Sequence, residues 1–292
     1  MTYRLLSLGH GFSARALTRD FGADWTVIGT TRTPEKAEVL RSEGVTPLVW
    51  PGSDLTGEIA RATHILASAA PSPAGDPFLP EIADALRSAR PHWVGYLSTT
   101  GVYGDHAGAW VDEDTALTPA TERGQRRVEA EAAWRTIAAD AGWPLHIFRL
   151  AGIYGPGRGP FEKVRRGEAR RIVKPGQVFS RIHVDDIAQI VAASMAAPVP
   201  GGRAYNLCDD DPAPPQDVLA HAAALLGLPP PPEVPFEAAE LSPMARSFYA
   251  ESKRVRNDRI KAELGVKLRY PTYREGLRAL LDSEGNPPRA NP

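Results

Sequence analysis

Cysteine and long apolar runs are scarce in this chain of 292 residues. Cys208 is its only cysteine, which excludes an intramolecular disulfide and a thiolate metal cluster. No run approaches the ~18 apolar residues that a membrane-spanning helix needs, and the apolar stretch at the N-terminus is too short for a signal peptide. No cluster of His, Asp or Glu has the spacing of metal ligands, so no metal is expected.

An excess of charge of either sign is also lacking. Lys and Arg number 34 and Asp and Glu number 35, which gives a formal net charge of −1. This balance argues against a nucleic-acid binder driven by bulk charge and against a polybasic membrane binder. Hydrophobic residues make up 42% and charged residues 24%, the composition of an ordinary globular protein. We expect a cytoplasmic protein that binds a small molecule and neither nucleic acid nor a membrane.

Strand and helix signals alternate through the first half of the chain. The strands are predicted at 4–8, 25–30, 45–50, 63–69, 93–97 and 145–150, and the main helices at 12–21, 34–43, 78–89 and 121–141. Strands separated by helices of this length imply βαβ units and a parallel sheet. We therefore predict a doubly wound parallel α/β domain over residues 1–154.

The pattern changes after Gly152. A Gly- and Pro-rich loop at 155–160 is followed by a predicted helix at 185–196 and a strand at 204–208. We predict a smaller C-terminal lobe over 155–292, with residues 182–208 returning to the first domain. A cofactor is then expected across the carboxyl ends of the strands and a substrate cleft between the two lobes.

A glycine turn joins the first predicted strand to the first helix and reads GHGFSA, which fits GxGxxA. This context is the one that a dinucleotide-binding fingerprint requires. The first glycine permits the tight turn, the second lets the backbone approach a pyrophosphate, and the alanine keeps the helix close to the strand. The helix N-terminus adds N–H donors and partial positive charge. The alternative is a glycine turn without a ligand. The predicted contacts are Gly9, His10, Gly11, Phe12, Ser13 and Ala14.

The end of the second strand indicates which dinucleotide binds. An NAD site usually has Asp or Glu there, to hold the ribose 2′-hydroxyl. The chain instead continues to Thr31 and Arg32 without a carboxylate. Arg32 could pair with a 2′-phosphate, with the Thr31 hydroxyl and Arg15 as further donors. A solvated Arg32 is the alternative, but the pattern favours NADP over NAD.

Several later segments carry motifs in a fixed order. They are 98–104 (STTGVYG), Arg149 with 153–157 (IYGPG), 182–187 (IHVDDI), 205–207 (YNL), Lys253 and Asn257 with 264–265 (LG), and Pro271 with 275–277 (EGL). In this order they resemble the extended short-chain dehydrogenases/reductases, the group of NAD(P)-dependent sugar epimerases and dehydratases. The chain is most similar to the atypical members of that group, which have a GxGxxG/A turn, and the resemblance covers nearly the whole chain.

The resemblance implies a Rossmann-type domain and further cofactor contacts. Asp54 and Leu55 match a pair of residues near the adenine. Ala69 and Ala70 match the small residues beside the pyrophosphate and the ribose. Close packing at a strand end is the alternative explanation for the two alanines.

The family's catalytic residues are only partly present. The resemblance implies a Ser or Thr, a Tyr that exchanges the proton and a Lys that holds the nicotinamide ribose. Thr99 occupies the first position, but Arg123 stands at the Tyr position and Arg127 at the Lys position. Arginine stays protonated, so Arg123 cannot shuttle a proton, whereas Arg127 could still bind the ribose. The alternative is a solvated helix face with i,i+4 ion pairs, which is the favoured interpretation for Arg123 and Arg126.

Three other side chains are candidate acids, namely Tyr103, Tyr154 and His183, and each also has a structural explanation. Phe179 stands where nucleotide-sugar enzymes of this family carry an arginine, although Arg158 could still contribute to an anionic-ligand pocket. Two functions remain open. One is an NADP-binding oxidoreductase or epimerase that acts on a small, sugar-like substrate, and the other is a non-catalytic NAD(P)-binding sensor or scaffold. The oligomeric state is open too, with a homodimer as one arrangement.

Overall fold

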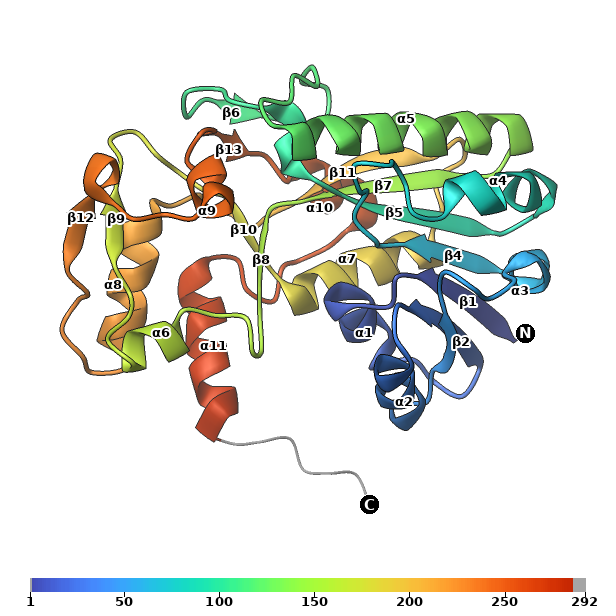
Figure 1. The fold of residues 1–292 in the computed structure, drawn as a ribbon, viewed down its shortest axis with the longest axis horizontal. Helices are drawn as coiled ribbons and strands as arrows, with labels where there is room; N and C mark the ends of the chain where they lie inside the picture. The colour runs from blue at the N-terminus through green and yellow to red at the C-terminus, as the bar shows by residue number, and fades with distance from the viewer. Residues whose placement is uncertain (1, 286–292) are drawn as a thin grey trace.

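A seven-stranded parallel sheet forms the centre of the molecule (Figure 1). The computed structural model describes residues 2–285. The strands run in the order β11-β7-β5-β4-β1-β2-β3 across the sheet. Their bounds are Tyr3–Leu8 (β1), Trp25–Thr31 (β2), Thr46–Val49 (β3), His64–Ala67 (β4), Trp93–Thr99 (β5), Leu145–Leu150 (β7) and Arg203–Leu207 (β11). This arrangement confirms the predicted doubly wound α/β fold.

Helices cover both faces of the sheet, and each face has its own apolar core (Figure 1). One face carries α1 (Phe12–Thr18), α2 (Pro34–Ser42), α7 (Val184–Ala196) and α10 (Asp258–Leu264). The other carries α3 (Thr56–Arg61), α4 (Leu79–Ser88) and α5 (Glu122–Ala141). Side chains alternate between the faces, so Leu5 enters the first core and Leu6 the second.

Local capping explains the bounds of the helices that position the site. The Thr33 side chain caps α2 by accepting the Lys36 N–H, and Thr121 caps α5 by accepting the Gly124 N–H at 3.1 Å. Gly142, in the left-handed conformation, ends α5. Helix α1 is shorter than predicted, because the chain turns after Thr18. Helix α3 was not expected from the sequence, since its six residues are too few for a clear apolar period.

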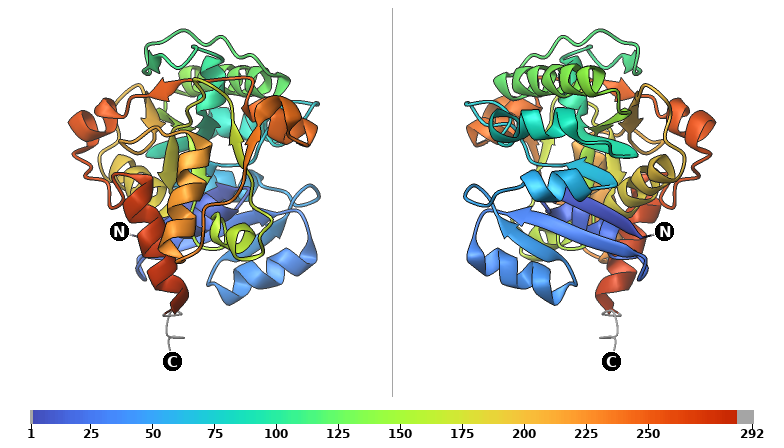
Figure 2. Two further views of the ribbon diagram at one scale, coloured as in Figure 1. Left: turned by 90° about the vertical axis from the view of Figure 1, so that its left-hand side faces the viewer. Right: turned by 90° about the vertical axis from the view of Figure 1, so that its right-hand side faces the viewer.

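The smaller lobe has a core of its own, formed by α6 (Phe161–Arg165), α8 (Pro215–Leu225) and α11 (Tyr273–Gly285) (Figure 2). Three short parallel strand pairs accompany it. They are β8 (Gly152–Tyr154) with β10 (Arg181–His183), β9 (Arg171–Val173) with β12 (Glu233–Pro235), and β6 (Trp110–Val111) with β13 (Arg254–Val255). Strands of two or three residues have no readable period, so the sequence analysis did not find them.

Several segments of the second half lie on the larger domain. Strand β11 extends the sheet beside β7, and α7 packs against α1. Helix α10 packs against α7 and β11, so residues beyond 208 also return to this domain. Across the described residues 2–285, we find no helix with the length and apolar character needed to cross a membrane.

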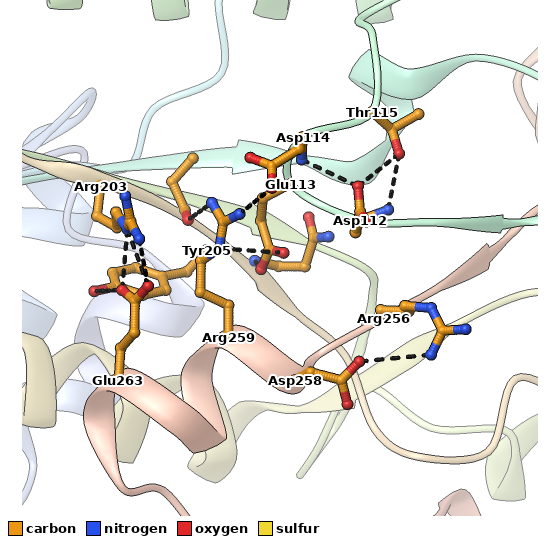
Figure 3. A network of polar contacts seen from close by, with 12 residues as sticks. Asp112, Glu113, Asp114, Thr115, Arg203, Tyr205, Arg256, Asp258, Arg259 and Glu263 are labelled. Atoms are coloured by element: carbon orange, nitrogen blue, oxygen red, sulfur yellow. Dashed lines mark hydrogen bonds and ion pairs between the residues drawn. The ribbon is translucent and has the colours of Figure 1, made fainter.

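An ion-pair network ties α10 to the edge of the sheet (Figure 3). Arg259 of α10 pairs with Asp114 at 2.7 Å and lies 3.7 Å from Glu113. Glu113 also accepts the backbone N–H of Asn206 in β11 at 2.8 Å. The loop after β6 is thereby fixed against both β11 and α10.

Candidate functional site

A cleft of about 750 Å³ opens at the carboxyl ends of the strands, where the larger domain meets the lobe. The sheet order reverses between β1 and β4, and ligands of doubly wound folds bind outside the strand ends at such a point. The cleft is lined by the glycine turn after β1, the end of β5, the start of α5, residues 150–154 and 178–181, and residues 245–255 around α9 (Pro243–Phe248) and β13.

The two glycines of the turn have different roles. Gly9 has φ +83°, and a Cβ there would lie 2.9 Å from the Cβ of Ala69, so the turn itself requires glycine. A Cβ at Gly11 would meet nothing closer than the Gly9 carbonyl at 3.8 Å. Gly11 lines the cleft, so a larger side chain would take the space that a ligand needs. The residues of the turn therefore fit a dinucleotide pyrophosphate.

The side chains of the turn divide between interior and cleft. Phe12 and Ser13 line the cleft, whereas Ala14 is buried in the core. His10 is turned toward β2, where its side chain packs so closely that a Cβ at Gly29 would lie 2.8 Å from the His10 Cβ. Burial lowers the pKa of His10 to about 4, so the ring is neutral. Its backbone N–H donates to the Thr30 carbonyl at 2.9 Å, and His10 does not line the cleft, so this predicted contact has a packing role.

The predicted cofactor contacts around β2 differ in whether their side chains already have a partner in the chain. Arg32 is exposed at the end of β2 and makes no ion pair within residues 2–285, and Thr31 before it is half-buried. Arg15 forms an ion pair with Glu43 at the end of α2, so its guanidinium is already engaged. Arg32 is the free cation at this strand end in the described part of the chain.

The predicted cofactor contacts after β3 and β4 differ in burial. The Asp54 carboxylate is exposed and accepts the Thr56 N–H of its own loop at 2.9 Å, while Leu55 is buried in the core. Ala69 lies against Gly9, and Ala70 is exposed beside it. Of these four residues, Leu55 has a packing role, which places its side chain away from a ligand.

Thr99 and Arg127 both line the cleft. Thr99 ends β5, and its Oγ1 accepts the Gly101 N–H at 3.2 Å, which leaves the hydroxyl proton available for donation. Arg127 donates from Nη1 to the Tyr96 hydroxyl at 2.9 Å and to the Leu97 carbonyl at 2.8 Å. These bonds hold the Arg127 guanidinium against the ends of the strands.

Arg123 lies one turn before Arg127 on α5 and is held differently. Its guanidinium stacks on the ring of Phe248, 5.2 Å from the centroid, and it makes no hydrogen bond or ion pair with residues 2–285. Desolvation in the cleft lowers its pKa, and the charges of Arg127 and Arg158 lower it further. Arg126 does form the expected i,i+4 pair, with Glu122 at 2.7 Å. Arg126 thus forms the ion pair of the solvated-face interpretation, whereas Arg123 is exposed as that interpretation expects but forms no such pair within residues 2–285.

Two of the three candidate acids lie outside the cleft. Tyr103 is fully buried; its hydroxyl donates to Asn206 at 2.7 Å and accepts from Arg149 at 2.9 Å, and burial raises its pKa to about 12. His183 caps α7 by accepting the Asp185 N–H at 3.1 Å, and burial lowers its pKa to about 4. This placement contradicts the expectation that either side chain could be the catalytic acid, because a substrate cannot reach them.

Tyr154 does line the cleft, but its hydroxyl is poorly placed for proton transfer. The hydroxyl is buried, has no hydrogen-bond partner within residues 2–285, and lies against Gly276 of α11, where a Cβ would overlap it. Burial, with the nearby charge of Asp209, raises the pKa of Tyr154, which makes it a weaker acid. The structure thus offers no strong proton donor at Tyr154.

Some cleft residues were not found by sequence reasoning. Phe248 and Glu251 come from the irregular chain around α9, and no motif marks them. Lys253, matched only through the resemblance, donates to the Gly104 carbonyl and to Glu251, both at 2.6 Å. It therefore fixes the loop after β5 to β13. No group of three or more His, Cys, Asp or Glu able to hold a metal exists within residues 2–285.

Comparisons with known proteins show the family to which the chain belongs. Residues 80–208 match the NAD dependent epimerase/dehydratase family. Protein YeeZ of Escherichia coli K12 is 30% identical over 281 residues, which cover 90% of this chain and 95% of YeeZ. A Streptomyces protein named 3-diazoavenalumate denitrifying reductase is 30% identical over 57% of this chain and 58% of its own length. The solved structure of a conserved protein of unknown function from Silicibacter pomeroyi is 58% identical, with a TM-score of 0.89 over 97% of this chain and 99% of that one. The chain therefore belongs to the NAD-dependent epimerase/dehydratase family.

Proposed function

We propose that this protein binds NADP and acts as an oxidoreductase or epimerase on a small substrate held in the cleft. The observation that carries the proposal is the open space at Gly11, which faces the same cleft as Thr99 and Arg127. Membership of an NAD-dependent family supports it, and so does the 30% identity to a protein named as a reductase.

The chain supplies donors for three parts of the cofactor. The N–H groups that begin α1, at Phe12 and Ser13, would hold the pyrophosphate. The exposed Arg32, with the Thr31 hydroxyl, would hold a 2′-phosphate and so favour NADP over NAD. Arg127, fixed at the ends of the strands, would bind the nicotinamide ribose. When bound, the cofactor supplies or accepts a hydride.

The proton chemistry falls to other groups than the family's tyrosine. Arg123 stays charged and cannot exchange a proton. The Thr99 hydroxyl, whose oxygen already accepts the Gly101 N–H, can donate a hydrogen bond to a substrate oxygen. Since a general acid typically contributes ~10²–10⁴-fold, we expect slow turnover with solvent as the source of the proton.

Titration calorimetry tests the binding step directly. NADPH should bind wild-type protein, and Gly11→Val should lose that binding while its circular dichroism and melting temperature stay unchanged, because the new side chain meets only open space. Gly44→Val is the matched control. A Cβ at Gly44 also meets open space, but Gly44 lies at the end of α2, outside the cleft. Valine at a φ of +78° should lower stability and leave NADPH affinity unchanged. Equal NADPH affinity for wild type and Gly11→Val would refute the proposed site.

A non-catalytic sensor is the second candidate, favoured by the lack of an ionisable acid at position 123 and by the buried hydroxyl of Tyr154. The two functions differ in the effect of Thr99→Val. An enzyme should lose turnover of NADPH with an aldehyde and ketone panel in this variant and keep its NADPH affinity. Tight NADPH binding by the wild type with no turnover of any member of the panel would favour the sensor.

A further inference from the structure

The cleft concentrates positive charge. Five of the side chains that line it in the described part of the chain are basic, namely Arg123, Arg127, Arg158, Arg181 and Lys253, whereas Glu251 is the one acidic side chain there. Glu251 is already paired with Lys253 at 2.6 Å. Uncompensated charge of one sign in a partly desolvated cleft attracts a ligand of the opposite sign.

The five basic groups are not equally available. Lys253 is committed to Glu251, Arg127 to the ends of the strands, and Arg181 donates to the carbonyls of Phe179 and Ala213. Arg123 and Arg158 are exposed, and neither side chain makes a hydrogen bond or an ion pair with residues 2–285. These two guanidinium groups are therefore the free cations of the cleft within that range.

Both free guanidinium groups lie over aromatic rings. The Arg123 Cζ is 5.2 Å from the centroid of the Phe248 ring, and the Arg158 Cζ is 5.6 Å from that of Phe12. A cation–π contact of this kind uses none of the N–H donors in a hydrogen bond. The donors of both arginines are left for the oxygens of a carboxylate or phosphate.

The two arginines belong to different parts of the molecule. Arg123 is on α5 of the larger domain, and Arg158 is in the loop between β8 and α6 that leads into the lobe. Both side chains line the same cleft, and the charge of Arg158 also contributes to the lowered pKa of Arg123. An anion between them would relieve this repulsion and join the two walls of the cleft.

We propose that Arg123 and Arg158 form a clamp for an anionic group, a carboxylate or a phosphate, on the substrate. This inference rests on the proposed function, and it gives Arg123 a positive role: the residue at the tyrosine position binds and positions the substrate. Nucleotide-sugar enzymes of the family carry an arginine at the position of Phe179. In this chain the clamp would supply an anion site elsewhere in the same cleft.

Three probes with one aromatic body test the clamp: benzoate, phenyl phosphate and the neutral benzamide. Their affinities are measured by ligand-observed NMR on the full chain saturated with NADP⁺, so no turnover is needed. At least one anion should bind about tenfold or more tighter than benzamide, as expected for charge-assisted hydrogen bonds. The stronger of the two anions identifies the substrate group as carboxylate or phosphate.

Variants assign the effect to the two arginines. Arg123→Gln and Arg158→Gln should each remove the preference for the anion, and Arg126→Gln should keep it, because Arg126 lies on the same helix but pairs with Glu122. Equal binding of anions and benzamide by the wild type would overturn the clamp and leave the proposed function standing. Loss of NADP⁺ affinity in Arg158→Gln would also overturn it, by assigning Arg158 to the cofactor. Failure of the wild type to bind NADP⁺ at all would reject the proposed function itself.

Discussion

Two arginines, one on a strand of the central sheet and one in the cleft, show how the same side chain serves folding or binding. Arg149 on β7 has an almost fully buried side chain, pairs with Glu131 at 2.9 Å and donates to Tyr103. Arg123 is exposed, stacked on one ring, and has no polar partner in residues 2–285. A buried charge must be paired in the folded chain, whereas an unpaired charge in a cleft is left for a ligand. The comparison separates residues that stabilise the fold from residues that define the site.

The largest effect expected from this comparison is on stability. Arg149→Met should lower the free energy of unfolding by ~3–5 kcal/mol, because it leaves the Glu131 carboxylate buried without its cation. Urea unfolding followed by circular dichroism measures the loss. Adding Glu131→Gln should recover part of it by removing the lone charge. A loss below ~1 kcal/mol would show that the pair has no structural role.

A second interior charge gives a pH-dependent effect. Asp209 is buried, and burial raises its pKa from 3.8 to about 8, against the opposing effect of Arg181. The folded state thus prefers the neutral acid, so this stabilising contribution is complete below about pH 4 and is lost as the pH rises to about 8. Relative to Asp209→Asn, the wild type should lose up to ~1.4 kcal/mol per pH unit in that window. Urea unfolding at pH 5 and pH 8 compares the two proteins, and a constant difference would contradict the shift.

A third arginine, Arg32, is exposed and does not line the cleft. Arg32→Ala should weaken NADPH binding roughly tenfold or more and leave NADH binding unchanged, since a charge-assisted contact to the 2′-phosphate contributes ~1.5–3 kcal/mol. Arg41→Ala is the matched control, because Arg41 is an exposed arginine of α2 that pairs with Glu38. Equal wild-type affinities for NADPH and NADH, measured by calorimetry, would refute the preference.

The smallest effect is expected where an arginine binds a ligand and contributes little to the fold. Arg123→Gln and Arg126→Gln should each change the free energy of unfolding by less than ~0.5 kcal/mol. Thermal unfolding without ligand measures both. A loss from Arg123→Gln comparable with that from Arg149→Met would remove the distinction between the two kinds of arginine.

The sequence predicted the elements whose signals are local or periodic. The strand, glycine turn and helix around Gly9 and Gly11 lie where they were expected, and Thr99 and Arg127 both line the cleft. The candidate acids Tyr103 and His183 could not be judged in the same way. Whether a tyrosine or a histidine faces a cleft or a core depends on the strands and helices that pack over it.

The sequence by itself determined the alternation of strands and helices, the turn that permits a dinucleotide, and the presence of arginines at positions 123 and 127. These follow from backbone conformation, apolar periodicity and side-chain chemistry, which are properties of neighbouring residues. Only the tertiary structure decided that Arg149 is paired and buried, while Arg123 lines the same cleft as Arg158 and has no polar partner within residues 2–285. Their partners, or the lack of them, come from segments distant in the chain, such as Phe248 and Phe12, and it is the packing of those segments that brings the charges together or leaves them for a ligand.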